Sequence, residues 1–212
     1  MLEEQFFTIL FDRLGRIESV RPSIILAAEA VISAVTHGGR LVVYDENGQM
    51  NGESSYRNSG LKLPTDGRAP DGGLVDVDAK DVVIIYSLMP GTERSFAAFD
   101  KARDAGSYIL AVCPRTRGGV IPPGRLLAAE ADIHIDDLSD SDGVVLPEGW
   151  TTPIASTTGI MNDVILWAFH VEIIDRMLAR GMVPGVQRGG HLRGGRAWNH
   201  AVSDSLFNER GW

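Results

Sequence analysis

The 212-residue sequence lacks several features that would define its compartment or its scaffold. Its one cysteine, Cys113, excludes an internal disulfide framework and a zinc site built on cysteines. No apolar run approaches the length of a membrane span. The opening residues are acidic and then amphipathic, unlike a signal peptide. We therefore expect a cytoplasmic protein.

Positive charge is also scarce, and the formal net charge is -8. Such a charge argues against a general nucleic-acid binder or membrane-surface binder, because its field would repel both. The length suits one α/β domain, and neither an internal repeat nor a domain boundary is visible. We predict a single domain over residues 1–212, with helices at its start and a glycine- and arginine-rich tail at 182–212.

The rest of the chain is organised around residues 81–106. Residues 82–86 form an apolar run rich in β-branched side chains, which is typical of a parallel strand buried on both faces. A turn at 87–92 follows, and apolar residues then recur at helical spacing before a stop at Gly106. Strand, turn and helix make half of a βαβ unit, and ligands bind beyond the carboxyl ends of such strands.

Further strands and helices alternate along the chain. Apolar residues at helical spacing predict helices, and short apolar runs predict buried strands. We expect helices at 2–14, 22–36, 53–58, 126–131 and 157–180, and strands at 40–44, 74–77, 108–113 and 133–135, with 64–73 as a surface loop. This alternation predicts an α/β fold, a three-layer αβα sandwich around a mostly parallel sheet.

Residues 136–148 form an acidic loop with spaced aspartates. A calcium-binding loop can look similar, but this one lacks the glycine and the closing glutamate spacing of an EF-hand. We therefore predict that this loop is solvated surface and that the chain has no metal site.

Two groups of small polar residues stand where helices are expected to begin. They are Ser87, Gly91, Thr92 and Ser95 after the 82–86 run, and Ser156, Thr157 and Thr158 later in the chain. Hydroxyls and the amides of a helix start are suited to binding phosphate. Ordinary helix capping also explains such residues, although one capping residue suffices and three hydroxyls together favour a ligand.

The order of these parts resembles the sugar isomerase (SIS) domain family over roughly residues 21–199. The resemblance rests on GGRLVVYDENG, DVVIIYSLMPGTERSFAAFDKARDAG and YILAVC, and on the hydroxyls that open a long helix. The ending LARGMVPGVQRGGHLRGGRAWN is similar to that of an uncharacterised group related to phosphoheptose isomerase. The resemblance implies a Rossmann-like sandwich that binds a phosphorylated sugar without a cofactor.

The family's first loop usually reads Gly-x-Gly-x-Ser. Residues 45–49 read Asp-Glu-Asn-Gly-Gln, so one glycine remains, the serine is absent and two acids have entered. The resemblance implies that Asn47 and Gly48 contact the substrate. Whether Asp45 and Glu46 recruit a metal stays open.

The family's second loop usually reads Ser-x-Ser-Gly, followed by Thr or Asn. Here Ser87 matches the first serine, Pro90 stands in place of a serine, and Gly91 and Thr92 keep the end of the pattern. Half of the phosphate cradle is therefore present. The resemblance implies a phosphate held by the hydroxyls of this turn and by those at 156–158.

Aldose–ketose isomerisation needs a base that moves a proton between adjacent carbons. In the family this base is a glutamate on the helix after the first loop, which implies Glu53; an acid favoured by the helix dipole is the alternative. The family's histidine on a late helix implies His170, although a lone helical histidine is more often packed or solvated. His191, between Arg188 and Arg193, is the rival candidate.

The tail is a basic island, because no acidic residue occurs in residues 177–199. Its glycines would let Arg188 and Arg193 approach a ligand or a partner closely, and a flexible, solvated tail is the alternative. SIS sites are commonly completed by a second subunit. The resemblance therefore implies a homodimer whose sites lie near the subunit interface, with the tail reaching across.

Three functions compete. The first is a phosphosugar isomerase, favoured by Glu53, His170 and the basic tail. The second is a non-catalytic phosphosugar-binding sensor or subunit, favoured by the altered first loop. A dinucleotide-dependent oxidoreductase is the weakest, because no G-x-G-x-x-G follows Tyr44.

Overall fold

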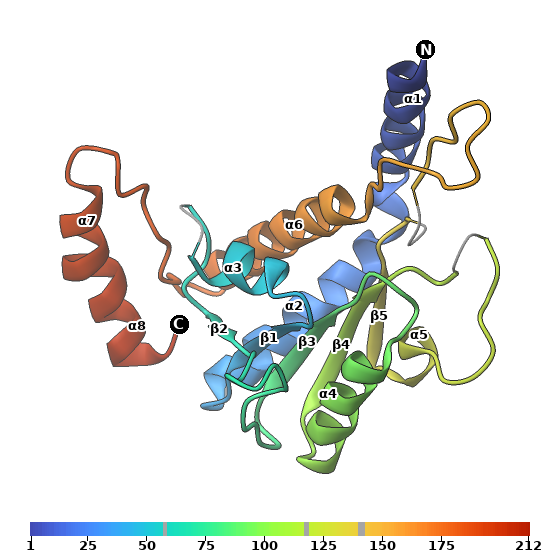
Figure 1. Cartoon of the computed structure of the whole chain (residues 1–212). Coiled ribbons are helices and arrows are strands. Elements are labelled where there is room, and N and C mark those ends of the chain that lie inside the picture. The colour runs from blue at the N-terminus through green and yellow to red at the C-terminus, as the bar shows by residue number, and fades with distance from the viewer. Residues whose placement is uncertain (57–58, 117–118, 140–142) are drawn as a thin grey trace.

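The structure, a computed structural model, describes residues 1–56, 59–116, 119–139 and 143–212. Five strands form one sheet in the order β2-β1-β3-β4-β5, and each neighbouring pair is parallel. The strands are β1 (Leu41–Asp45), β2 (Pro64–Asp66), β3 (Val82–Tyr86), β4 (Tyr108–Cys113) and β5 (Ile133–Asp136). Helices cover both faces of the sheet (Figure 1), so the predicted three-layer sandwich is confirmed.

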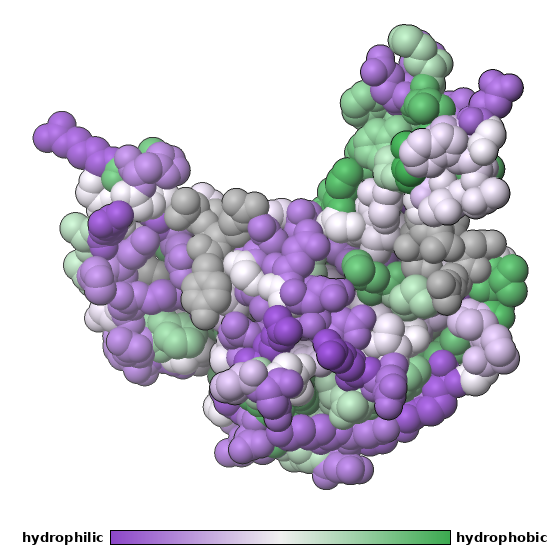
Figure 2. All heavy atoms as spheres, in the orientation of Figure 1, coloured by the Kyte–Doolittle hydropathy of each residue, from purple (hydrophilic) through white to green (hydrophobic). Residues whose placement is uncertain are grey.

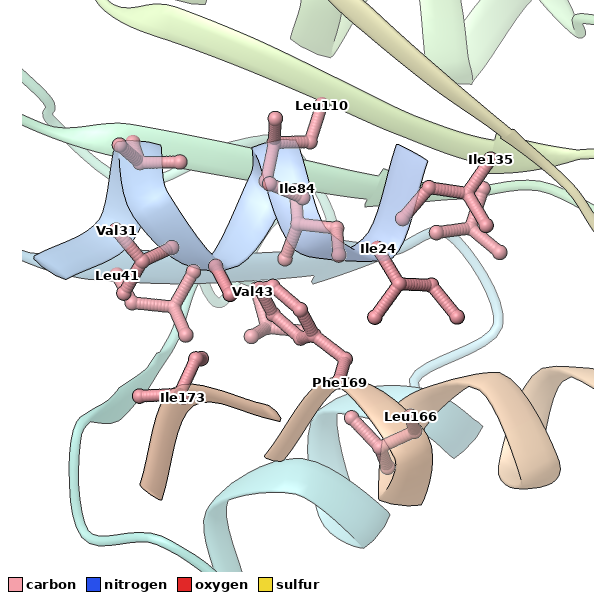
Figure 3. Close-up of a cluster of buried hydrophobic side chains, with 14 of the residues drawn as sticks. Ile24, Val31, Leu41, Val43, Ile84, Leu110, Ile135, Leu166, Phe169 and Ile173 are labelled. Carbon is pink, nitrogen blue, oxygen red and sulfur yellow. The ribbon is translucent and has the colours of Figure 1, made fainter. Parts of the chain in front are cut away.

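The central strands are apolar because both of their faces are buried. One face packs on α2 (Arg21–Thr36) and α6 (Thr158–Ala179). Figure 3 shows side chains of both helices meeting those of the strands in this cluster. The other face packs on α4 (Glu93–Asp104) and α5 (Leu127–Glu130), around the fully buried Phe99.

The sequence of α2 explains its close packing. Pro22 lies in the first turn, where no intrahelical amide bond is lost. Ala27 and Ala28 are fully buried, and their small side chains let α2 approach the sheet and α6. The helix ends shortly before Gly38, whose φ of +81° is rarely adopted by a residue with a side chain.

Two segments project from the sandwich. One is α1 (Leu2–Gly15), which continues through η1 (Ile17–Ser19) into α2, and the other contains α7 (Gly195–Trp198), η2 (Asn199–Ser203) and α8 (Asp204–Arg210). α1 stands at the upper right of Figure 1 and α7 and α8 at the left, and Figure 2 shows a hollowed, largely hydrophilic surface between them. In the described parts of the chain, no single helix is long and apolar enough to cross a membrane; only the bent pair of residues 2–19 and 21–36 passes that test of length and composition.

Two of the predicted elements are wrong. Residues 64–73, predicted as a surface loop, contain β2, and 74–77, predicted as a strand, form none. Pro64 is tolerated at the start of β2 because this strand lies at the sheet edge and pairs only with β1. Leu74 instead joins the buried cluster on the α4 face and forms an isolated bridge with Arg68.

Two further predictions change, one about a helix boundary and one about the exposure of the acidic segment. The helix expected at 53–58 is α3 (Gln49–Tyr56), which begins directly after Gly48. The acidic segment 136–148 is not solvated throughout, because Asp137 is fully buried and Ser139 is 6% exposed. Residues 140–142 of that segment lie outside the described residues.

Candidate functional site

Three connections, β1–α3, β3–α4 and β5–α6, meet at the carboxyl edge of the sheet. Because the strands are parallel, their carboxyl ends share this edge, where open α/β sheets bind ligands. Direct contacts join the connections. The hydroxyl of Thr92 donates to Glu46 at 2.8 Å, and a Cβ added at Gly159 would lie 3.3 Å from Nε2 of Gln49. The predicted turns therefore form one continuous edge.

The first turn is capped by its own acid, Asp45. This residue is 4% exposed, and its carboxylate oxygens accept the amides of Asn47 and Met50, each at 3.0 Å. Asn47 itself is exposed, and Gly48 adopts a φ of +76°, which favours glycine. The carboxylate thus occupies amides at the start of α3 that a phosphate would otherwise bind.

The start of α4 is also next to a carboxylate. Thr92 and Ser95 form a reciprocal cap: Thr92 Oγ1 accepts the Ser95 amide at 3.0 Å, and Ser95 Oγ accepts the Thr92 amide at 2.7 Å. Glu46 accepts the hydroxyl proton of Thr92. The two hydroxyls predicted to hold a phosphate are engaged in this cap, and the adjacent carboxylate repels an anion.

Ser87 and Gly91 complete the second turn. Ser87 is buried at the end of β3, and its hydroxyl oxygen accepts the amide of Met89 at 3.3 Å. Packing requires the glycine, because a Cβ on Gly91 would lie 2.4 Å from the ring of Phe96. Both residues therefore have structural roles that need no ligand.

At the start of α6, hydroxyls and an arginine make side-chain contacts, whereas carboxylates contact the starts of α3 and α4. Thr157 and Thr158 are buried, and the hydroxyls of Ser156 and Thr158 lie 3.0 Å apart. Arg13, in the last turn of α1, donates to the hydroxyl of Thr157. Ser139, from the β5–α6 connection, places its hydroxyl 3.0 Å from that of Thr158. Hydroxyls and a guanidinium therefore contact the side chains of Thr157 and Thr158 at this helix start.

One acid, Asp137, is buried beside these hydroxyls. Its Oδ1 accepts the amide of Ser139 at 2.9 Å and the hydroxyl at 2.8 Å, whereas Oδ2 has no hydrogen-bond partner among the described residues. Burial raises the pKa of Asp137 to about 7, and the hydrogen bonds from Ser139 and the charge of Arg13 oppose this rise only in part. Near neutral pH this carboxyl therefore changes between its neutral and charged forms.

Several other buried polar atoms lack hydrogen-bond partners in the part of the chain that the structure describes, and two of them belong to the elements of this edge. They are the hydroxyl of Tyr86, at the end of β3, and Oδ1 of Asn162, early in α6. Burial, followed by the charges of Asp163 and Asp45, raises the pKa of Tyr86. Because buried polar atoms are normally paired with protein or water, these two require a further partner.

The candidate catalytic residues lie on two helices. Glu53 is half-buried in the second turn of α3, rather than at the helix start. His170, in α6, is 1% exposed, and burial lowers its pKa to about 4, so the imidazole is neutral at pH 7. Within the described residues, neither of its ring nitrogens has a hydrogen-bond partner.

The tail candidates follow the opposite end of α6. This helix has 22 residues and is therefore about 33 Å long at about 1.5 Å per residue. Figure 1 shows the tail leading away from its C-terminal end toward α7. Arg188 stacks on the ring of Trp198 at 4.1 Å, and His191 and Arg193 are exposed. Within one chain, the structure does not bring these side chains to the start of α6.

The sequence alone does not predict Arg13, Asp137 or Ser139 as site residues. Arg13 had one usable signal, because it follows the buried Leu10 by about one turn on the same side of α1. The other two lie in an acidic segment whose composition predicts exposure. The described residues contain no group of three or more His, Cys, Asp or Glu side chains that could hold a metal ion.

This arrangement of sheet and helices is the fold of sugar isomerase (SIS) domains, as the sequence resemblance predicts. A similar solved structure is a phosphoheptose isomerase from Francisella tularensis, with a TM-score of 0.55 and 14% identity over 82% of this chain and 98% of that one. Another is a protein from Methanococcus jannaschii whose structure is said to infer a 3-hexulose-6-phosphate isomerase function. It has a TM-score of 0.52 and 15% identity, over 85% of this chain and 93% of the other.

In sequence, the chain is similar to a UPF0309 protein of Streptomyces griseus. The two are 25% identical over an alignment that covers 95% of this chain and 93% of the relative. No known protein-family model matches the chain. The comparisons establish the fold, and any activity has to be argued from the site.

Proposed function

We propose that the chain is a member of the SIS family that binds a phosphorylated sugar at the carboxyl edge. The main observation is that polar side chains of three connections lie along that edge: Thr92 donates to Glu46, Gln49 lies next to Gly159 in α6, and Ser139 donates to Thr158. Two solved structures with this fold have descriptions that name phosphorylated-sugar isomerases, which supports the ligand class.

The edge suits a ligand with two chemically different ends. On the β1 and β3 side, the half-buried Glu46 presents a carboxylate, which accepts hydrogen bonds from sugar hydroxyls. On the α6 side, Arg13 and the hydroxyls donate to an oxyanion. A sugar phosphate with its phosphate toward α6 satisfies both sides, whereas the reverse orientation would place the phosphate against Glu46.

The geometry favours binding without turnover. An isomerase base must reach the substrate carbon, and His170 is enclosed among apolar and aromatic neighbours, including Trp167 and Phe169. Glu53 is then the remaining candidate base, and among the described residues no second candidate on the sandwich is left to handle the substrate oxygens during isomerisation. We therefore assign the chain to the non-catalytic class, a sensor or a subunit of a larger assembly.

A homodimer belongs to this proposal. Phe7 and Phe11 of α1 are 49% and 65% exposed, and their rings stack at 6.0 Å. A helix of 14 residues is marginal alone in water, so a second copy that covers this apolar side would stabilise it. The basic tail of the partner would then be able to complete the site. Light scattering after gel filtration tests this part, and a monomer at micromolar concentration would contradict it.

Thermal-shift measurements with sugar phosphates and the matching free sugars test the binding function. A ligand that binds only the native state raises the melting temperature, so we expect a rise that depends on the phosphate. Ser156→Ala should reduce it, whereas Ser205→Ala, at an exposed serine in α8, should not. A folded protein with no response to any sugar phosphate would contradict the proposal.

An isomerase assay separates the sensor from the enzyme. With a sugar phosphate that binds, the wild type and Glu53→Gln should both lack turnover and should bind equally well. If the wild type turns the substrate over and Glu53→Gln abolishes this turnover, the protein is an isomerase with Glu53 as its base, and the non-catalytic assignment is wrong.

A further inference from the structure

A polar cavity of about 250 Å³ lies beside the start of α6. Its lining, which we call the arginine pocket, consists of Arg13, Arg16, Arg115, Thr116, Asp136, Leu138 and Ser139. The pocket adjoins the carboxyl edge, because Ser139 lines it and also contacts Thr158. Among the described residues, three guanidinium groups and one carboxylate therefore line this cavity, in a chain whose net charge is -8.

Arg13 is the most buried of the three arginines, with 8% of its surface exposed. Its guanidinium contacts the hydroxyl of Thr157, so it also links the pocket to the start of α6. A buried guanidinium costs free energy unless hydrogen bonds and negative charge compensate it. Arg13 therefore brings a buried positive charge to the inner wall of the pocket.

The other two arginines present their donors at the surface. The side chain of Arg16 is 58% exposed and lies 3.7 Å from Asp12, and that of Arg115 is 67% exposed. Nε of Arg115 donates to Asp136 at 3.1 Å. Because a guanidinium has five N–H donors, this contact leaves most of the Arg115 donors available to an oxyanion.

We infer that the arginine pocket is an oxyanion site that takes a phosphate group. Guanidinium groups bind phosphate oxygens in pairs, and the start of the long helix α6 adds partial positive charge. The cavity has room for several water molecules of about 30 Å³ each, so a phosphate and the adjoining carbon of a small sugar fit. Resting on the proposed function, the pocket is the phosphate subsite of the bound sugar phosphate.

Phosphorus-31 NMR titrations with inorganic phosphate test the pocket without any sugar. Arg16→Ala and Arg115→Ala should each weaken phosphate binding by about tenfold or more, the loss expected for one charge-assisted hydrogen bond. Both side chains are exposed, so both variants should fold, and an unchanged melting temperature without phosphate checks this.

Arg21→Ala is the matched control. Its side chain is 62% exposed and pairs with Glu18 at 3.7 Å, much as Arg16 pairs with Asp12, but it does not line the pocket. It should change the affinity by less than about twofold, because an exposed charge that does not contact the anion is largely screened by salt. Asp136→Asn should instead strengthen binding, since it removes a negative charge and keeps Oδ1, which accepts the Leu138 amide.

The outcomes separate the pocket from the proposed function. Equal phosphate affinity in the wild type, Arg16→Ala and Arg115→Ala would overturn the inference, as would no phosphate binding by the wild type. The function would stand if sugar phosphates still raised the melting temperature of these variants. Conversely, phosphate binding that needs both arginines, with no sugar phosphate bound more tightly than phosphate itself, would support the pocket and overturn the function.

Discussion

The two sides of the carboxyl edge differ in which side chains contact the partly positive starts of their helices. On the β1 and β3 side, Asp45 caps α3, and Glu46 accepts a hydrogen bond from Thr92, the capping residue of α4. On the β5 side, the start of α6 contacts Arg13 and a group of hydroxyls instead. Helix starts attract anions in both places. On the first side the carboxylates of Asp45 and Glu46 bond the helix starts directly, whereas on the other side the acid, Asp137, bonds Ser139 and is held partly in its neutral form by burial.

This difference assigns a direction to a bound sugar phosphate. A carboxylate already in place excludes a phosphate by repulsion and by occupying the amides. The altered first loop therefore need not mean that phosphate binding is lost. It can mean that the phosphate lies at the other end of the edge, beside the arginine pocket.

The largest expected effect on the free energy of unfolding comes from Asp137→Asn, which removes the titratable acid beside the start of α6. The pKa of Asp137 is raised by burial, so the native state binds this proton more tightly than the unfolded chain does. The carboxyl therefore lowers the stability as the pH rises from about 4 to about 7. At about 1.4 kcal/mol per pKa unit, the variant should gain up to about 4 kcal/mol over the wild type above pH 7, and almost nothing at pH 4.

Urea unfolding of both proteins across this range gives that comparison. Among the described residues, the charged or titratable groups that act on Asp137 or lie against it are Arg13 from α1, Asp136 from β5 and Cys113 from β4. They are the same in both proteins, so the difference isolates Asp137. A difference that does not change with pH would show that the carboxyl is not held in its neutral form by burial.

The next effect comes from Asp45→Ala, which removes the acid that caps the first turn. Two amides at the start of α3 would lose their acceptor, and the unfolding free energy should fall by about 2–3 kcal/mol. Asn47→Ala is the control, since this neighbour is exposed and should cost less than about 0.5 kcal/mol. Similar losses in both variants would contradict the assigned cap.

A smaller effect is expected at the start of α4. Thr92→Ala removes the hydroxyl that accepts the Ser95 amide, and such caps contribute about 1 kcal/mol. Thr92→Ser keeps the hydroxyl and should restore most of this stability. Denaturant unfolding measures both variants, and a serine variant as unstable as the alanine variant would argue against a capping role.

The smallest change in stability should follow Glu46→Gln. This variant tests the difference between the two sides through phosphate binding rather than through stability. The bond to Thr92 is half-exposed, so its loss should cost less than about 0.5 kcal/mol. Without the carboxylate, the start of α4 should bind phosphate weakly, and Glu46→Gln should show a second, weaker phosphate site by NMR titration. An unchanged titration curve would show that Glu46 does not exclude anions from this turn.

The sequence predicts the core of the fold well because local patterns encode it. The apolar runs at 82–86 and 108–113 match β3 and β4 at both ends. The predicted edge strand at 133–135 is β5, and the long helix expected at 157–180 is α6. In contrast, β2 begins at a proline and contains an aspartate, so its pairing with β1 is not visible in its own residues.

The candidate site is less predictable because its contacts are distant in sequence. Arg13 and Thr157 are 144 residues apart, and no local pattern relates them. Asp137 lies in an acidic segment, and its burial follows from the position of α6 rather than from its neighbours. The sequence predicts the hydroxyls at 156–158 as ligand-binding residues because they are neighbours in the chain. The positions of the arginines near them depend on the tertiary fold.

The most direct test of the difference between the two sides is amide chemical-shift mapping by ¹H–¹⁵N NMR during a titration with inorganic phosphate. If the phosphate binds in the arginine pocket, the largest shifts belong to the amides of Arg115, Ser139 and Thr158, while those of Met50 and Ser95, at the starts of α3 and α4, stay in place. The largest shifts at Met50 and Ser95 would show that the acid-capped turns bind the anion, and would contradict the account.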